Sequence, residues 1–151
     1  MVQVSVVHKI VAVGFSWPVY IFNGDISRFL TAKEMVDLAW KNSRYNQELA
    51  IAYMSGAMKL LPDEPYTVNQ CSLIYVSMAK YQEALRCMDR AIELMPQNYL
   101  FYLGRGNIRM LSGDFDGARE SVMSAIKLAQ EEITKALCWF ELGVMALQEK
   151  L

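Results

Sequence analysis

Few residues in this chain could carry catalytic chemistry. Serine and acidic side chains are common, but there is a single histidine, His8. A Ser–His–Asp arrangement would require His8 to meet a serine from a distant part of the sequence. His8 also has no Cys, Asp or Glu at the spacing of a metal site. The sequence therefore predicts no catalytic residue, no metal and no cofactor, and an enzyme with an unrecognised site is the most distant alternative.

Two further patterns could bind or react, and neither predicts a reactive site. Gly104 and Gly106 resemble the start of a phosphate-binding loop, but no third glycine and no Lys-Ser/Thr pair follows them. Cys71, Cys87 and Cys138 are far apart and form no CxxC pair, which is typical of reduced, buried thiols. We expect the glycines to serve helix packing and the protein to be cytoplasmic.

Charge excludes one broad class of partner. The formal net charge of the 151 residues is -1, so the chain lacks the basic field that attracts nucleic-acid phosphates. One group of charges recurs at spacings of three and four residues along a single predicted helix, where opposite signs compensate on a solvated face. Its members are Glu83, Arg86, Asp89, Arg90 and Glu93. We expect a protein or peptide partner and no nucleic acid.

An internal repeat is the strongest signal in the sequence. Similar segments end 34 residues apart, at 56–62, 90–96 and 124–130. With the units numbered from residues 31, 65 and 99, small side chains occupy positions 20 and 27, where they allow two antiparallel helices to approach closely. These residues are Ala50, Ala57, Ala84, Ala91, Ala118 and Ala125. Pro62 and Pro96 end the second helices. A period of 34 is typical of helix–turn–helix repeats that stack on one another.

The first helices of the units agree with this pattern. Thr31 and Glu34 form a capping box at the start of the first unit. In the third unit Gly106 stands where helices cross, and Gly113 supplies the turn between helices. Together these residues resemble the tetratricopeptide repeat family. A further partial match, Trp139-x-x-Leu142-Gly143-x-x-Ala146, is offset from the period by three residues.

The resemblance implies an all-α fold, a right-handed superhelical stack of helix–turn–helix repeats. We expect three repeats at 31–64, 65–98 and 99–135, followed by a C-terminal helix at 136–151 that is a partial fourth repeat or a cap. Residues 1–30 form an apolar N-terminal arm outside the repeats.

The family also implies a function, the binding of a peptide or helix of a partner protein by a non-enzymatic scaffold or adaptor. In this family, positions 2, 5, 9, 12 and 13 of each unit face the groove. The corresponding residues are Met35, Ala39, Asn42, Tyr66, Asn69, Leu73, Val76, Ser77, Leu100, Leu103, Asn107 and Met110. The amides among them can hydrogen-bond a peptide backbone, while Met, Leu and Tyr form apolar pockets.

Two subgroups of the family allow a finer comparison. Members that dock chaperones grip a C-terminal carboxylate with Lys, Arg and Asn, but here Met35 and Leu103 stand where Lys is expected, and only Asn107 matches. Bacterial type III secretion chaperones for translocator proteins are similar in layout, with an N-terminal arm, three repeats and a final helix. A chaperone of this kind is the alternative function.

The two ends of the chain leave several interpretations open. The apolar run 10–22 is short for a membrane span and contains Pro18. It could cover the first repeat, form a contact with a partner or another copy, or serve as a targeting or membrane-surface segment. Residues 136–147 are apolar nearly all round and could cover the third repeat or contact another subunit. The candidates for self-association as a homodimer are Phe15, Trp17, Tyr20, Phe22, Trp139 and Phe140.

Overall fold

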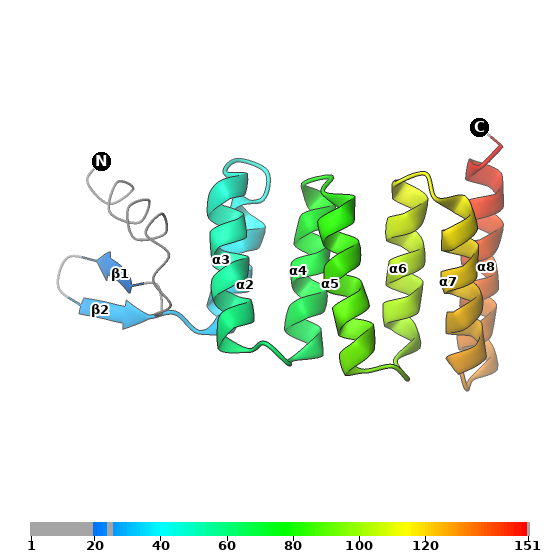
Figure 1. Ribbon diagram of the computed structural model, residues 1–151, viewed down its shortest axis with the longest axis horizontal. Helices are drawn as coiled ribbons and strands as arrows, with labels where there is room; N and C mark the ends of the chain where they lie inside the picture. Colours follow the sequence, from blue (N-terminus) through cyan, green and yellow to red (C-terminus); the bar gives the residue numbers. More distant parts are fainter. Residues whose placement is uncertain (1–19, 24–25, 151) are drawn as a thin grey trace. The chain divides into compact units, whose positions relative to one another are not determined.

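The chain is all-α apart from one short hairpin, as the repeat predicts (Figure 1). The computed structural model describes residues 20–23 and 26–150. Its elements are β1 (Tyr20–Asn23), β2 (Ile26–Phe29), α2 (Ala32–Asn42), α3 (Gln47–Leu60), α4 (Pro65–Ser77), α5 (Tyr81–Leu94), α6 (Tyr99–Leu111), α7 (Phe115–Leu128) and α8 (Glu132–Gln148). They fall into two compact units, an N-terminal unit (Met1–Asp63) and a C-terminal unit (Glu64–Leu151).

The N-terminal unit contains a hairpin and one helix pair. Strands β1 and β2 are antiparallel, with Tyr20 opposite Phe29. Phe15 and Trp17, which we singled out for self-association, lie outside the described residues, as does most of the apolar run 10–22. Helix α2 packs on α3 and begins with the predicted capping box. The Thr31 hydroxyl oxygen accepts a hydrogen bond from the Glu34 amide at 3.3 Å, and the Glu34 carboxylate accepts one from the Thr31 amide at 2.9 Å.

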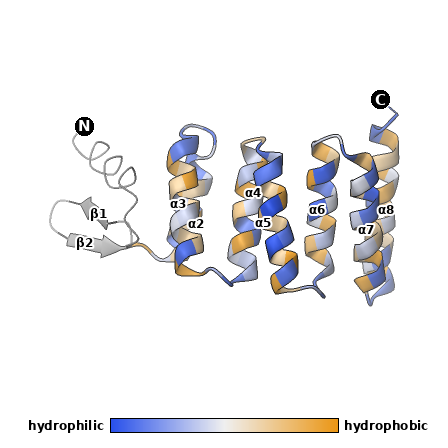
Figure 2. Ribbon diagram, viewed as in Figure 1, coloured by the Kyte–Doolittle hydropathy of each residue, from blue (hydrophilic) through white to orange (hydrophobic). Residues whose placement is uncertain are grey.

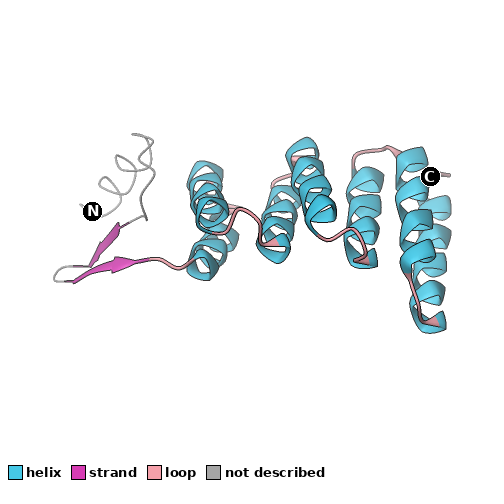
Figure 3. Cartoon of the chain, turned by 60° about the horizontal axis from the view of Figure 1, so that its bottom comes forward, coloured by secondary structure: helices cyan, strands magenta, loops and turns pink. Residues whose placement is uncertain are grey.

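The C-terminal unit is a stack of five helices. Neighbouring helices in the sequence pack on one another, α4 on α5, α5 on α6, α6 on α7 and α7 on α8 (Figure 3). Helix α8 begins at Glu132, four residues before the boundary that we expected at residue 136. None of the described helices has the length and apolar character that crossing a membrane requires.

Small residues set the spacing within each helix pair. The six alanines at positions 20 and 27 of the units are all fully buried, which confirms their predicted role. Larger apolar residues at position 24 lie between them and are also buried, namely Met54, Met88 and Val122. Close packing at these positions explains why the period is readable in the sequence.

The turns inside the second and third repeats use the same backbone geometry. At position 15 of each repeat, Ala79 has φ +56° and Gly113 has φ +86°. Glycine adopts this left-handed conformation without steric cost, as we expected for Gly113. Alanine accepts it only at some cost in conformational energy, so the fold imposes the turn on Ala79.

Candidate binding surface on the first helices

The predicted groove residues of the C-terminal unit lie on α4 and α6, the first helices of their repeats. On α4, Tyr66 is 54% exposed and Leu73 is 37% exposed, while Asn69 and Val76 are half-buried. Ser77 is exposed at the end of α4, where its hydroxyl donates to the Ile74 carbonyl at 2.7 Å. All five keep surface that a partner could contact.

Helix α6 continues the same kind of surface. Leu100 is 53% exposed, and Leu103, Asn107 and Met110 are half-buried. We call the residues that the prediction named on α4 and α6 the first-helix surface. The two helices meet where the Tyr66 ring packs edge-on against Phe101, with ring centroids 5.9 Å apart. The Tyr66 hydroxyl also lies 4.0 Å from the sulfur of Met95.

Asn107 carries an unused hydrogen-bond acceptor. Among the described side chains, its Oδ1 is the buried oxygen or nitrogen that has no hydrogen-bond partner. An unpaired buried polar atom costs roughly 1–3 kcal/mol relative to a satisfied one. A donor supplied by a bound peptide, such as a backbone N–H, would remove this cost.

The predicted groove residues of α2 do not form a comparable surface. Met35 and Ala39 are buried, with exposed fractions of 1% and 0%, so neither can contact a partner in this structure. A Cβ placed on Gly56 of α3 would lie 2.8 Å from the Met35 sulfur, which shows that Met35 packs on α3. The Asn42 side chain donates to the Leu38 carbonyl of its own helix at 2.7 Å. Burial therefore removes Met35 and Ala39 from the candidate surface.

Helix α8 supplies surface that the groove prediction missed. Buried residues of α6 recur in α8 exactly one offset period later, because Phe101 and Ile108 correspond to Cys138 and Met145, 37 residues on. This is the three-residue offset seen in the Trp139–Ala146 motif. In that register the groove positions of α8 are Leu137, Phe140, Val144 and Leu147.

These α8 residues are apolar and mostly exposed. Phe140 and Leu147 are each 68% exposed, and Leu137 is 58% exposed. We had assigned Phe140 to self-association, whereas its position in the repeat is one that faces the groove in this family. The offset motif was the signal that could have found these residues, since it fixes which side of α8 corresponds to which side of α6.

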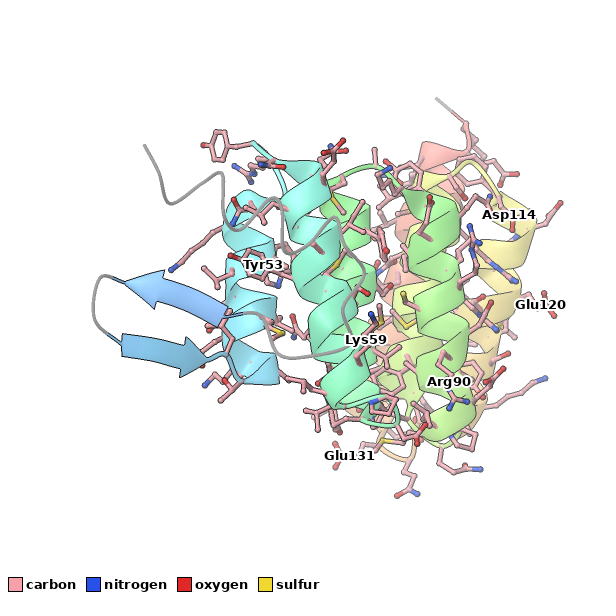
Figure 4. The ribbon with its side chains drawn as sticks, turned by 60° about the vertical axis from the view of Figure 1, so that its left-hand side comes forward. Tyr53, Lys59, Arg90, Asp114, Glu120 and Glu131 are labelled. Carbon is pink, nitrogen blue, oxygen red and sulfur yellow. The ribbon has the colours of Figure 1, made fainter. Side chains whose placement is uncertain are left out.

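The arginines of α6 face away from this surface and are engaged by α7. Arg105 donates through Nε to the Ser121 hydroxyl at 3.1 Å and pairs with Asp89 at 3.2 Å. Arg109 donates to the Gly117 carbonyl at 2.9 Å. Its guanidinium also lies 3.7 Å from Asp114 and 3.5 Å from Glu120, two residues labelled in Figure 4. The residues of the first-helix surface are therefore uncharged, which suits an apolar partner better than a carboxylate.

The thiols offer no reactive group. Burial, followed by the neighbouring Cys87, raises the pKa of Cys71 to about 12. Burial also raises the pKa of Cys87 and of Cys138. All three cysteines are free, and because the thiolate is the nucleophile, they are poorly reactive at neutral pH. In the part of the chain that the structure describes, no three His, Cys, Asp or Glu side chains are grouped to hold a metal ion.

Comparison with known sequences supports the repeat assignment. The family model described as tetratricopeptide repeat matches residues 69–98. Human tetratricopeptide repeat protein 13 is 29% identical over 104 residues, which cover 66% of this chain and 12% of that protein. Human tetratricopeptide repeat protein 7B is 30% identical over 113 residues, covering 69% of this chain and 13% of that protein. The chain thus spans about an eighth of the length of these relatives.

Solved structures share the fold at low sequence identity. The first repeat domain of Spaghetti (RPAP3), bound to an HSP90 peptide, has a TM-score of 0.61 and 16% identity, covering 80% of this chain and 94% of that chain. PcrH in complex with the chaperone-binding region of PopD has a TM-score of 0.61 and 16% identity, covering 78% and 92%. The Yersinia enterocolitica translocator chaperone SycD has a TM-score of 0.62 and 13% identity, covering 79% and 86%.

Proposed function

We propose that this tetratricopeptide repeat protein is a non-enzymatic interaction module that binds an apolar peptide or helix of a partner protein on its first-helix surface. The observation that carries the proposal is the combination of exposed apolar side chains with the buried, unpaired Oδ1 of Asn107. Apolar pockets would supply affinity, and the amide oxygen would accept a backbone N–H of the peptide. Several solved proteins of this fold bind a peptide or a segment of another protein.

The chemistry of the surface restricts the partner. The surface offers Tyr66, Leu73, Leu100 and Leu103 to apolar side chains, and it carries no cation. An acidic C-terminus would find nothing to neutralise it there, because Arg105 and Arg109 are engaged on α7. We therefore expect an internal, apolar segment of the partner, in an extended or helical conformation.

A double variant tests this proposal. Leu73→Ser with Leu103→Ser removes apolar contact area from α4 and α6, and affinity purification followed by quantitative mass spectrometry compares it with the unchanged protein. We expect the specific partner to be lost and the far-UV circular dichroism spectrum to be retained. The matched control, Arg86→Gln with Arg90→Gln, changes two residues of α5 outside the surface. Loss of the partner in the control and its retention in the Leu variant would contradict the proposal.

A translocator chaperone of type III secretion is the second candidate function. The fold similarity to PcrH and SycD, which covers most of both of those chains, favours it. Its test is isothermal titration calorimetry with a synthetic peptide of the chaperone-binding region of PopD. Binding that Leu103→Ser weakens would support this role, and the absence of heat at high micromolar peptide would count against it.

The expected compartment rests on the thiols. The three free cysteines include two that are fully buried, which is typical of a reducing environment. We propose a cytoplasmic location, which fractionation of cells that express the tagged chain would test.

A further inference from the structure

Helix α8 exposes more apolar surface than the other helices of the C-terminal unit. Ile133 is 76% exposed, Phe140 and Leu147 are 68% exposed, and Trp139 is 55% exposed. In Figure 2, α8 lies at the C-terminal end of the stack with many apolar residues along it. A repeat stack normally ends in a helix with a polar outer face, because the last helix has no neighbour to cover it.

The face of α8 that lacks a neighbour is identified by two glycines at equivalent positions. A Cβ placed on Gly106 of α6 would lie 2.8 Å from Val122 and 3.3 Å from the Ala118 carbonyl, so α7 packs directly on that glycine. A Cβ placed on Gly143 of α8 would meet nothing within 4 Å. Gly143 thus marks a place prepared for a closely packed helix, and none of the described helices occupies it.

The residues around Gly143 form what we call the Gly143 face. At 100° per residue along α8, Ala136, Trp139, Phe140, Ala146 and Leu147 all lie within about 60° of Gly143. Their exposed area, together with that of Ile133 at the edge, is on the order of 500–600 Å², judged from the exposed fractions and usual side-chain areas. That equals the largest apolar patches of soluble monomers and approaches the roughly 800 Å² that each partner contributes to a stable interface.

We propose that the Gly143 face binds the same face of a second copy of this chain, so that two α8 helices cross in antiparallel orientation at their Gly143 residues. In a two-fold arrangement centred there, Phe140 faces Ala146 of the second copy, and Trp139 faces Leu147 of the second copy. Large side chains thus meet small or complementary ones, which a self-complementary contact requires. The missing Cβ of Gly143 lets the two backbones approach closely at the crossing.

The charges at the ends of α8 suit this antiparallel pairing. Glu131 and Glu132 lie at the N-terminal end and Lys150 at the C-terminal end, and all three are exposed. Antiparallel pairing brings the basic end of one copy to the acidic end of the other. The helix dipoles of the two α8 helices are then opposed as well, an arrangement that is electrostatically favourable.

The oligomeric state of the whole chain tests the proposal without any partner. Light scattering after gel filtration, over a range from about 1 to 100 µM, should give the mass of a dimer at the upper concentrations. Gly143→Leu places a side chain where a monomer has open space, so it should leave the thermal unfolding midpoint unchanged while raising the dimer dissociation constant at least tenfold. Trp139→Glu should have the same effect on the mass. Leu111→Glu, which alters an exposed leucine of α6, is the matched control and should leave the dimer intact.

Three outcomes would overturn the proposal. The first is a monomer mass at every concentration, including the case where a helix of another protein is found on the Gly143 face. The second is a dimer that Gly143→Leu and Trp139→Glu both leave unchanged. The third is a dimer that only the deletion of residues 1–30 abolishes, since contact would then involve the N-terminal arm. None of these results depends on peptide binding by the first-helix surface, so the two proposals fail separately.

Discussion

The second and third repeats build the same helix pair around different chemistry. At positions 7, 11 and 23, the second repeat has Cys71, Tyr75 and Cys87, and the third has Arg105, Arg109 and Ser121. In the third repeat the two guanidinium groups donate to the Ser121 hydroxyl, at 3.1 and 3.2 Å, between α6 and α7.

The cluster of the second repeat is neutral and apolar. Burial raises the pKa of Tyr75, and the thiols of Cys87 and Cys71 raise it further, which places the three groups close together. Both clusters fit between helices whose separation is set by fully buried alanines at positions 20 and 27. The alanines therefore define the scaffold, and the positions between them accept either an apolar cluster or a hydrogen-bonded one.

The largest expected effect comes from altering that shared scaffold. Replacing Ala91 of α5 by Leu should destabilise the protein by about 1–3 kcal/mol, because added atoms force a close-packed helix pair apart. Ala125→Leu in α7 should cost a similar amount if the two pairs share one scaffold. Urea unfolding measures both, and a loss in only one of the two would show that the repeats do not pack alike.

A smaller loss should follow from breaking the polar cluster of the third repeat. Arg109→Leu leaves the Gly117 carbonyl without its donor and should cost about 1–2 kcal/mol. The equivalent change in the second repeat, Tyr75→Leu, removes no printed hydrogen bond and should cost less. Combining Arg109→Leu with Ser121→Ala should give less than the sum of the single losses, because the two side chains share a hydrogen bond.

The neutral cluster of the second repeat should respond to alkaline pH. The pKa of Cys71 is raised from 9.0 to about 12 in the folded protein, so its stabilising effect is full below pH 9 and is lost as pH rises towards 12. The expected decline is at most about 1 kcal/mol per pH unit from this thiol. Cys71→Val should flatten the decline in urea unfolding between pH 8 and 10, whereas a change in the third repeat such as Ser121→Ala should not.

The smallest stability effect is expected at Asn107. Asn107→Leu removes a buried oxygen that has no partner, so the free energy of unfolding should stay the same or rise by up to about 1 kcal/mol. Partner binding should nevertheless weaken if the amide oxygen accepts a hydrogen bond from the peptide. A clear loss of stability in urea unfolding would instead show that Asn107 serves the fold.

The sequence alone determined the helix pairs, because the features that form them are local and repeated. Ala50 to Ala125 recur at fixed spacing, Thr31 and Glu34 cap a helix within one turn, and Gly113 supplies a turn between neighbouring helices. Each of these requires only contacts within one repeat, so the period was enough to identify them. The same argument correctly placed Gly106 against a neighbouring helix.

Tertiary structure decided which residues remain available to a partner. Met35 and Ala39 occupy groove positions by number, yet they are buried, whereas Leu73 and Leu100 at equivalent kinds of position are exposed. Arg105 and Arg109 are recruited by Ser121 and Gly117 of another helix, which no spacing within α6 predicts. Exposure and hydrogen bonding depend on every element packed around a side chain. A period fixes where a residue stands along its helix, and only the assembled neighbours fix what that residue can still touch.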